Sequence, residues 1–133
     1  MKDIVWGDVL SVGVTEIDND HRMLINTFNV LNHAVAEGKS RDYLAAVLEE
    51  LINCTVWHFS HEERLMLQYA YDDLTAHKAE HRELIESARE LQQEILRGGE
   101  GVTEANIEYL ERWLTEHIFT TDMRMGTFLY EAM

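Results

Sequence analysis

The sequence predicts an all-α protein, folded as an up-down-up-down antiparallel four-helix bundle with an ordered N-terminal leader and a short C-terminal tail. The first observation is that the 133 residues contain no proline and only seven glycines, so few positions interrupt a helix. The second is that apolar side chains recur every three or four residues along four long stretches. The third is that the connections between these stretches are short, which makes neighbouring helices run in opposite directions.

The length fits one domain spanning residues 1–133, with a formal net charge of −14. This charge disfavours nucleic acid or an anionic membrane as a partner, because both recruit basic surfaces. It serves solubility or, alternatively, forms an acidic docking face. The single cysteine forms no internal disulfide, and neither a signal-like segment nor an apolar run of about 18 residues occurs. We therefore expect a cytoplasmic protein without membrane insertion.

The chain should begin with a leader and then enter its first helix. Residues 1–17 have mixed polarity and no sustained helical period, so we expect them to lie across the bundle with Trp6 as their anchor. Asp18 or Asn19 has the side-chain chemistry of an N-cap. The first helix should therefore span about residues 18–37.

Three more helices should follow. Ser40 is a suitable cap for the second, which we expect over about residues 41–69. The third should span about residues 73–97, and a glycine-rich segment separates it from the fourth, expected over about residues 103–125. We expect Gly126 to stop the fourth helix and leave a short tail.

Metal-ligand side chains interrupt every apolar stripe. They are His21 on the first helix, His58 and Glu62 on the second, His77 and His81 on the third, and His117 with Asp122 nearby on the fourth. A lone histidine on an apolar stripe is most often a hydrogen-bonded core residue. Seven such groups on four facing stripes would leave many buried polar atoms without partners unless they bind metal. The sequence therefore predicts a buried metal centre.

Five imidazoles and two carboxylates are too many for one ion and suit two. If both carboxylates and a solvent oxygen bridge the ions, the histidines divide three and two, and only one ion keeps an open position. No histidine has a glutamate three residues before it, so the Glu-x-x-His signature of ferritin-like di-iron proteins is absent. His33 and His61 fall off the stripes, and we expect both at the surface.

Asp122 poses a geometric problem for the fourth helix. In a regular α-helix, a residue five positions after His117 lies about 140° around the axis from it. Either the helix ends between the two residues or it makes one wide turn. Residues 118–121 contain no helix breaker. We therefore predict a π-type turn between His117 and Asp122, a feature that is frequent at functional sites.

Short motifs extend the ligand pattern along almost the whole chain. They are Trp6, Val12-Gly13-Val14, Ile17-Asp18-Asn19-Asp20-His21, His58-Phe59, Glu62-Glu63, Met66, Tyr71, His77, His81, His117-Ile118 and Asp122. Together they resemble the hemerythrin family, so residues 1–133 resemble one hemerythrin-like domain. The family usually has Gly-Tyr-Pro before the third helix, whereas this chain has Ala70-Tyr71-Asp72, which leaves the start of that helix open.

The resemblance implies a cofactor and a function. In hemerythrins these positions hold two iron ions (Fe2+/Fe3+) with a bridging oxo or hydroxo group, and the centre binds dioxygen reversibly. The resemblance also assigns each ligand: His77, His81 and His117 to the saturated iron, His21 and His58 to the open iron, and Glu62 and Asp122 to the bridge.

Apolar side chains near the open position should form the ligand pocket, and our candidates are Ile25, Phe59, Trp113 and Leu114. We expect a monomeric oxygen carrier, store or sink, not an enzyme, with an oxygen-consuming enzyme as the partner that receives the dioxygen. The alternatives are a di-iron oxidoreductase acting on peroxide or nitric oxide, a di-zinc hydrolase, and an oxygen or redox sensor module.

Overall fold

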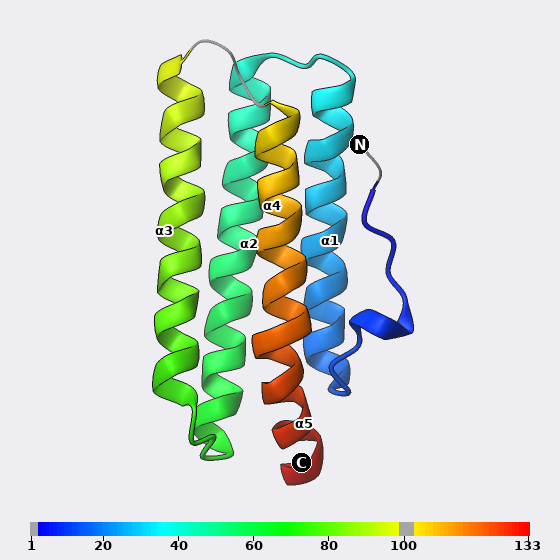
Figure 1. Ribbon diagram of the computed structural model, residues 1–133, viewed down its shortest axis with the longest axis vertical. Helices are drawn as coiled ribbons and strands as arrows, with labels where there is room; N and C mark the ends of the chain where they lie inside the picture. Colours follow the sequence, from blue (N-terminus) through cyan, green and yellow to red (C-terminus); the bar gives the residue numbers. More distant parts are fainter. Residues whose placement is uncertain (1–2, 99–102) are drawn as a thin grey trace.

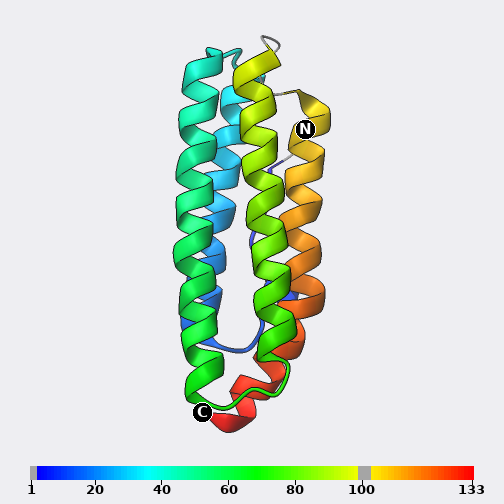
Figure 2. The same cartoon turned by 90° about the vertical axis from the view of Figure 1, so that its left-hand side faces the viewer.

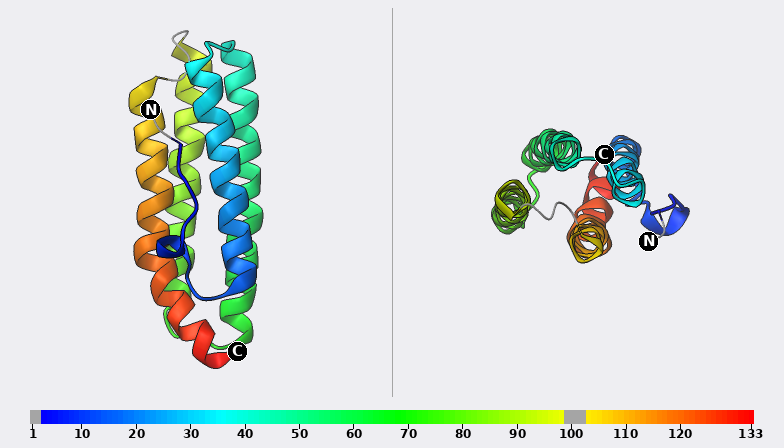
Figure 3. Two further views of the ribbon diagram at one scale, coloured as in Figure 1. Left: turned by 90° about the vertical axis from the view of Figure 1, so that its right-hand side faces the viewer. Right: turned by 90° about the horizontal axis from the view of Figure 1, so that it is seen from above.

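The computed structural model describes residues 3–98 and 103–133, where all regular secondary structure is helical. Four long helices alternate in direction, and they stand at the corners of a square when viewed along the bundle (Figures 1 and 3). The elements are η1 (Asp8–Leu10), α1 (Thr15–Ala36), α2 (Arg41–Gln68), α3 (Leu74–Gly98), α4 (Glu104–His117), the π-helical segment η2 (Ile118–Asp122) and α5 (Met123–Ala132). The predicted all-α four-helix bundle is therefore confirmed.

Of the glycine-rich segment predicted between the third and fourth helices, Gly99 and Gly101 lie outside the described residues. Within the described ranges, no helix combines the length and apolarity needed to cross a bilayer.

The bundle divides into two halves along its length. The aliphatic half lies at the end that holds the α1–α2 connection, and its buried residues include Phe28, Leu31, Leu44, Leu48, Leu51, Leu91, Ile95, Ile107 and Leu110. Each buried side chain of this size contributes about 1.5–3 kcal/mol through removal from water. The ligand half lies at the end that holds the α2–α3 turn, and it contains all seven predicted ligand residues.

The leader runs alongside α1 in the opposite direction, on the side of α4 (Figure 3). The Asn29 side chain holds its start, because it accepts a hydrogen bond from the Ile4 backbone N–H at 3.0 Å and donates one to the Ile4 carbonyl at 2.8 Å. Trp6 is half-buried against the core, and the Arg22 guanidinium lies 4.5 Å from the centre of its ring. Trp6 therefore shares the anchoring of the leader with Asn29.

The first helix begins earlier than the sequence suggested. α1 starts at Thr15, and no side chain caps its N-terminus. The expectation that Asp18 or Asn19 forms the N-cap is wrong. Asp18 lies within the helix, and its carboxylate accepts hydrogen bonds from the Val12 backbone N–H at 2.8 Å and the Ser11 hydroxyl at 2.6 Å. It stabilises the leader and not the start of its own helix.

The chain also stays helical beyond Gly126, where we expected the fourth helix to stop. α5 continues to Ala132 and turns beneath the end of the bundle (Figure 2). Glycine is required here by close packing, because a Cβ atom at Gly126 would lie 2.2 Å from the Val12 carbonyl oxygen of the leader. The expected tail is part of this helix, and its Phe128 ring packs 4.9 Å from that of Tyr71.

The α2–α3 turn contains a residue in an unusual backbone conformation. Ala70 has a φ angle of +56°, in the left-handed region that glycine normally occupies at the end of a helix. The Ala70 N–H donates to the Leu67 carbonyl at 3.3 Å, and the Tyr71 N–H donates to the Met66 carbonyl at 2.9 Å. These bonds close α2 and direct the chain into α3.

Candidate metal centre

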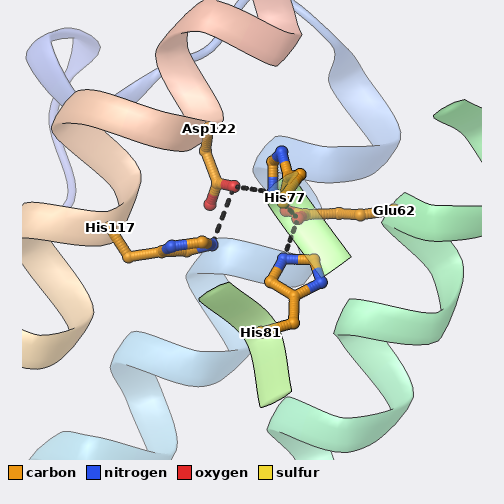
Figure 4. A group of neighbouring side chains, drawn as sticks. All are labelled: Glu62, His77, His81, His117 and Asp122. Carbon is orange, nitrogen blue, oxygen red and sulfur yellow. Dashed lines mark hydrogen bonds and ion pairs between the residues drawn. The ribbon is translucent and has the colours of Figure 1, made fainter. Parts of the chain in front are cut away.

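All seven predicted ligand side chains converge in the ligand half, and each is at most 5% exposed. Figure 4 shows five of them pointing toward one another from α2, α3, α4 and η2. The seven come from four sides of the bundle: His21 from α1, His58 and Glu62 from α2, His77 and His81 from α3, and His117 and Asp122 from α4 and η2. The structure thus brings together side chains that are up to about a hundred residues apart in sequence.

The π-helical segment η2 orients Asp122. Within it the Met123 N–H donates to the Ile118 carbonyl, five residues earlier, so this turn is wider than an α-helical one. The wide turn returns residue 122 to the face of His117, and the Asp122 Oδ1 atom lies 3.0 Å from the His117 Nε2 atom. The predicted π-type turn between His117 and Asp122 is confirmed.

Glu62 lies in the middle of the cluster and divides its two oxygens between two sets of histidines. Its Oε2 atom lies 2.7 Å from the Nε2 atom of His58 and 3.4 Å from that of His21. Its Oε1 atom lies 3.0 Å from the Nε2 atom of His81 and 3.2 Å from that of His77. One carboxylate therefore faces two separate positions for a cation.

Asp122 makes the same division from the opposite side. Its Oδ2 atom lies 2.9 Å from the Nε2 atom of His21. Its Oδ1 atom lies 3.2 Å from that of His77 and 3.0 Å from that of His117. The cluster thus contains two groups, which we call the two-histidine group (His21 and His58) and the three-histidine group (His77, His81 and His117).

The spacing of these donor atoms fits metal coordination. Nitrogen and oxygen ligands lie about 2.1 Å from a transition-metal ion, so neighbouring ligands of an octahedral ion lie about 3.0 Å apart. The observed separations of 2.7–3.4 Å match this value. Among the described residues, buried atoms without an aligned hydrogen bond include the Nε2 atoms of His21, His58, His81 and His117 and both oxygens of Asp122. The donor set therefore fits two cations that share both carboxylates.

The charges of the cluster shift its pKa values strongly. Burial alone would lower the pKa of His58, but the Glu62 charge and hydrogen bonds to Asp20 and Glu62 raise it to about 10. Burial would also lower the pKa values of His77 and His117. The interactions with Asp122 outweigh this effect and raise them to about 9 and about 10 respectively. Metal ligation requires neutral imidazoles, so cations must displace these protons when they bind.

The two histidines predicted at the surface behave differently. His33 is exposed and pairs with Asp3 at 2.6 Å. His61 is only 11% exposed, so its predicted surface position is wrong. Its Nδ1 atom donates a hydrogen bond to Asp20, and its Nε2 atom lies 3.2 Å from Glu16. The stripe of one helix could not reveal that α1 covers this side of α2.

No sequence pattern predicted the ligand contacts of three acidic residues, although two of them stand in the motifs that resemble the family. Each carboxylate accepts a hydrogen bond from the Nδ1 atom of one ligand histidine. The available signal was their position, because each directly adjoins a predicted ligand in the chain. They are Asp20, Glu63 and Glu80, which contact His58, His81 and His117 respectively.

A small cavity adjoins four residues of the cluster, namely His21, His58, His117 and Asp122. The space open to the centre of a water-sized molecule is about 10 Å3, which is about enough for one such molecule. Apart from cluster residues, its walls are Leu24, Thr55, Phe59, Leu84, Trp113, Leu114 and Ile118. Three predicted pocket residues are therefore in place. Ile25 is buried but does not line the cavity, and Leu24, one position closer to His21 in the chain, takes that place.

Comparison with known proteins finds a matching family model and similar chains. Residues 12–129 match the family model described as the hemerythrin HHE cation binding domain. A bacteriohemerythrin of Pseudomonas paraeruginosa is 36% identical over 92% of this chain and 78% of its own length. A bacteriohemerythrin of Methylococcus capsulatus is 32% identical, with 82% of each chain covered.

The fold shows the same likeness. A solved wild-type hemerythrin is 30% identical and superposes with a TM-score of 0.86, covering 96% of this chain and 98% of its own. The bundle and its buried histidine–carboxylate cluster thus define a helical cation-binding protein. The chain belongs to the hemerythrin family.

Proposed function

We propose that this chain binds two iron ions at the histidine–carboxylate cluster and takes up dioxygen reversibly beside them. The observation that carries the proposal is the division of both carboxylates, each of which offers one oxygen to each histidine group. Family membership supports it, because relatives that match most of the chain are bacteriohemerythrins and hemerythrins. Two ferrous ions would supply the electrons with which dioxygen is held.

In this proposal, the three-histidine group would hold one ion and the two-histidine group the other, where the smaller set of ligands would leave room for dioxygen. Glu62 and Asp122 would each offer one oxygen to either ion and offset part of the positive charge. Both carboxylates are fully buried, which a pair of cations compensates and which would otherwise be costly. The cavity is lined by His21 and His58 of the two-histidine group together with His117 and Asp122, so dioxygen would be held directly beside the cluster.

The cavity favours binding over turnover. Its polar wall groups outside the metal cluster are engaged with the backbone: the Thr55 hydroxyl donates to the Leu51 carbonyl at 2.6 Å, and the Trp113 indole N–H donates to the Leu84 carbonyl at 3.0 Å. Reduction of peroxide or nitric oxide needs a group that delivers protons to the substrate. An apolar pocket of this size suits a diatomic molecule and excludes bulk water. We therefore propose a carrier, store or sink that supplies an oxygen-consuming enzyme.

Metal analysis combined with visible spectra tests the proposal. We expect two iron ions per chain, and reduced protein that turns purple-red in air and bleaches when oxygen is removed. Irreversible browning with formation of a product would favour an oxidoreductase. A colourless protein with two zinc ions would favour a hydrolase, and either result would overturn oxygen carriage.

A further inference from the structure

We infer that Asp20, Glu63 and Glu80 are positioning residues of the metal centre: each accepts the Nδ1–H of one ligand histidine and so turns that ring's Nε2 atom toward the metal. This inference rests on the metal binding in the proposed function and extends it to residues outside the cluster. It assigns a role to three acids: Asp20 is buried, whereas Glu63 and Glu80 are partly exposed and would otherwise be taken for parts of a solvated helix face.

The contacts follow one rule around the bundle. Each acid adjoins a cluster residue on its own helix, yet it holds a ligand on the next helix. Asp20 of α1 accepts from His58 of α2 at 3.0 Å. The two other pairs continue in the same direction: Glu63 of α2 accepts from His81 of α3 at 2.9 Å, and Glu80 of α3 accepts from His117 of α4 at 2.7 Å.

The direction of these hydrogen bonds fixes the state of each ring. An ionised carboxylate is an acceptor only, so Nδ1 must carry the proton, and Nε2 of a neutral ring then offers its lone pair to a cation. The negative carboxylate also makes the imidazole a stronger donor. Each pair therefore sets both the orientation and the donor strength of one ligand.

The acids are themselves held in place. Thr121, which precedes Asp122, donates its hydroxyl to both oxygens of Glu80 at 2.8 and 2.7 Å. Glu80 thus accepts hydrogen bonds from both His117 and Thr121, and both contacts favour its ionised form. Asp20 is held by His61 in addition to His58, so it too is fixed by more than one contact.

The contacts also differ between the two metal positions. Glu63 and Glu80 both serve the three-histidine group, whereas Asp20 serves the two-histidine group. Loss of one acid should therefore weaken one metal position more than the other. A general effect of surface charge would weaken both positions equally, which provides a way to separate the two explanations.

Titration of the metal-free protein with Co(II), against a competing chelator, tests the inference without any oxygen chemistry. We expect Glu80→Leu to weaken one of two cobalt equivalents about 10- to 100-fold, as loss of such partners does elsewhere. Glu80→Gln should lose less, because its amide oxygen still accepts the Nδ1–H. The matched control is Glu83→Leu, the same change at an exposed position of α3. Asp20→Asn should affect the other cobalt equivalent.

Proton NMR of the cobalt-loaded protein adds a direct readout, because the exchangeable Nδ1–H signal of His117 should exchange faster with solvent in Glu80→Leu. If that variant fails to fold, Thr121→Val releases Glu80 and should give a smaller loss of the same equivalent. Cobalt affinities equal to those of Glu83→Leu would overturn the inference, as would equal losses in Glu80→Gln and Glu80→Leu. If cobalt binds in the expected pattern but the iron-loaded protein takes up no oxygen, the proposed function would be contradicted and this inference would stand.

Discussion

The two halves of this bundle are built from the same helices but are stabilised differently. In the aliphatic half, buried side chains such as Leu48 and Leu110 fill the space between helices without polar atoms. Its buried polar side chains are paired, as Gln92 is with Glu49 at 2.7 Å. In the ligand half, five imidazoles and two carboxylates occupy the corresponding positions. Within the part of the chain that the structure describes, the aliphatic half therefore contains no buried charge cluster for a cation to compensate, whereas the ligand half does.

This difference separates the half that secures the arrangement of the helices from the half that carries the metal centre. Hydrophobic burial in the aliphatic half secures the antiparallel arrangement of the four helices. That arrangement delivers one or two ligands from each helix to a common centre. The ligand half then gains stability from cations that compensate buried charge. Variants that affect one half and leave the other intact can test this separation.

The largest effect is expected for Glu62→Gln, because a neutral amide cannot bridge two cations. We expect metal content to fall from two ions per chain to fewer than one. The free energy of unfolding of the variant should be about 4 kcal/mol lower than that of the wild-type protein. This value applies when both are measured at a metal concentration about a thousandfold above the wild-type dissociation constant. Hydrogen exchange should show lost protection in the ligand half and retained protection in the aliphatic half. Elemental analysis and calorimetry provide the other measurements.

His33→Gln is the control for this variant, because His33 is exposed and pairs only with the leader residue Asp3 in the contacts described above. It should keep two ions per chain. An unchanged metal content in Glu62→Gln would rule out the bridging role. Loss of protection in both halves alike would show that they do not separate.

The next effect concerns pH. In metal-free protein, the pKa values of His58 and His77 lie at about 10 and about 9, above their ordinary value of 6.5. The stability that they contribute is therefore complete below pH 6.5 and is lost as the pH rises through about 9–10. Glu62 has a lowered pKa, so its contribution is present above its ordinary value of 4.5 and is lost on acidification.

Thermal melting of the chelator-treated protein should therefore show greatest stability between about pH 5 and 6.5 and a decline toward pH 10. Metal affinity should change in the opposite sense, rising about tenfold per pH unit for each proton displaced. Glu62→Gln should flatten the alkaline decline. A melting temperature of metal-free wild-type protein that stays constant from pH 7 to 10 would contradict this account.

A smaller effect should follow when one residue is enlarged in each half. Leu84 lines the cavity and Leu91 lies two turns later on α3 in the aliphatic half. Leu84→Phe should fill the cavity and slow dioxygen uptake about tenfold or more, with two ions still bound. Leu91→Phe should lower stability by about 1–3 kcal/mol through overpacking and leave uptake unchanged. Stopped-flow uptake and denaturant unfolding would measure both, and equal uptake rates would remove the cavity from the proposed route.

The periodicity of the sequence was sufficient to predict the helices and which side chains meet. Ligand-type residues stood where an apolar stripe should continue, and the mismatch of five residues between His117 and Asp122 required the wide turn. Such arguments need only the geometry of one helix at a time. The meeting of four stripes then follows from the bundle.

What the sequence could not predict depends on contacts between segments. Asp18 has the chemistry of an N-cap, and only the folded leader shows that it binds Val12 instead. Gly126 resembles a helix stop, and only the packed structure shows the leader carbonyl beside it. His61 and Glu80 find their partners on helices that lie about 40 residues away in the chain. Local patterns can mark such a residue by its position next to a ligand, but they do not show which residue of another helix it contacts.

The smallest effect expected is at the α2–α3 turn, the end of the ligand half. Ala70 adopts a φ angle of +56°, where its Cβ atom crowds the backbone at a cost of about 1–2 kcal/mol. Ala70→Gly removes this cost but makes the unfolded chain more flexible, so we expect a net stabilisation of about 1 kcal/mol. The control is Ala46→Gly, at an exposed position within α2 of the aliphatic half, which should lower stability by about 1 kcal/mol. Denaturant unfolding would compare the two in metal-free protein, where metal affinity cannot mask a change in the turn. A loss of stability in Ala70→Gly would mean that the turn is not strained. Alanine would then replace the glycine usual in the family at no cost in stability.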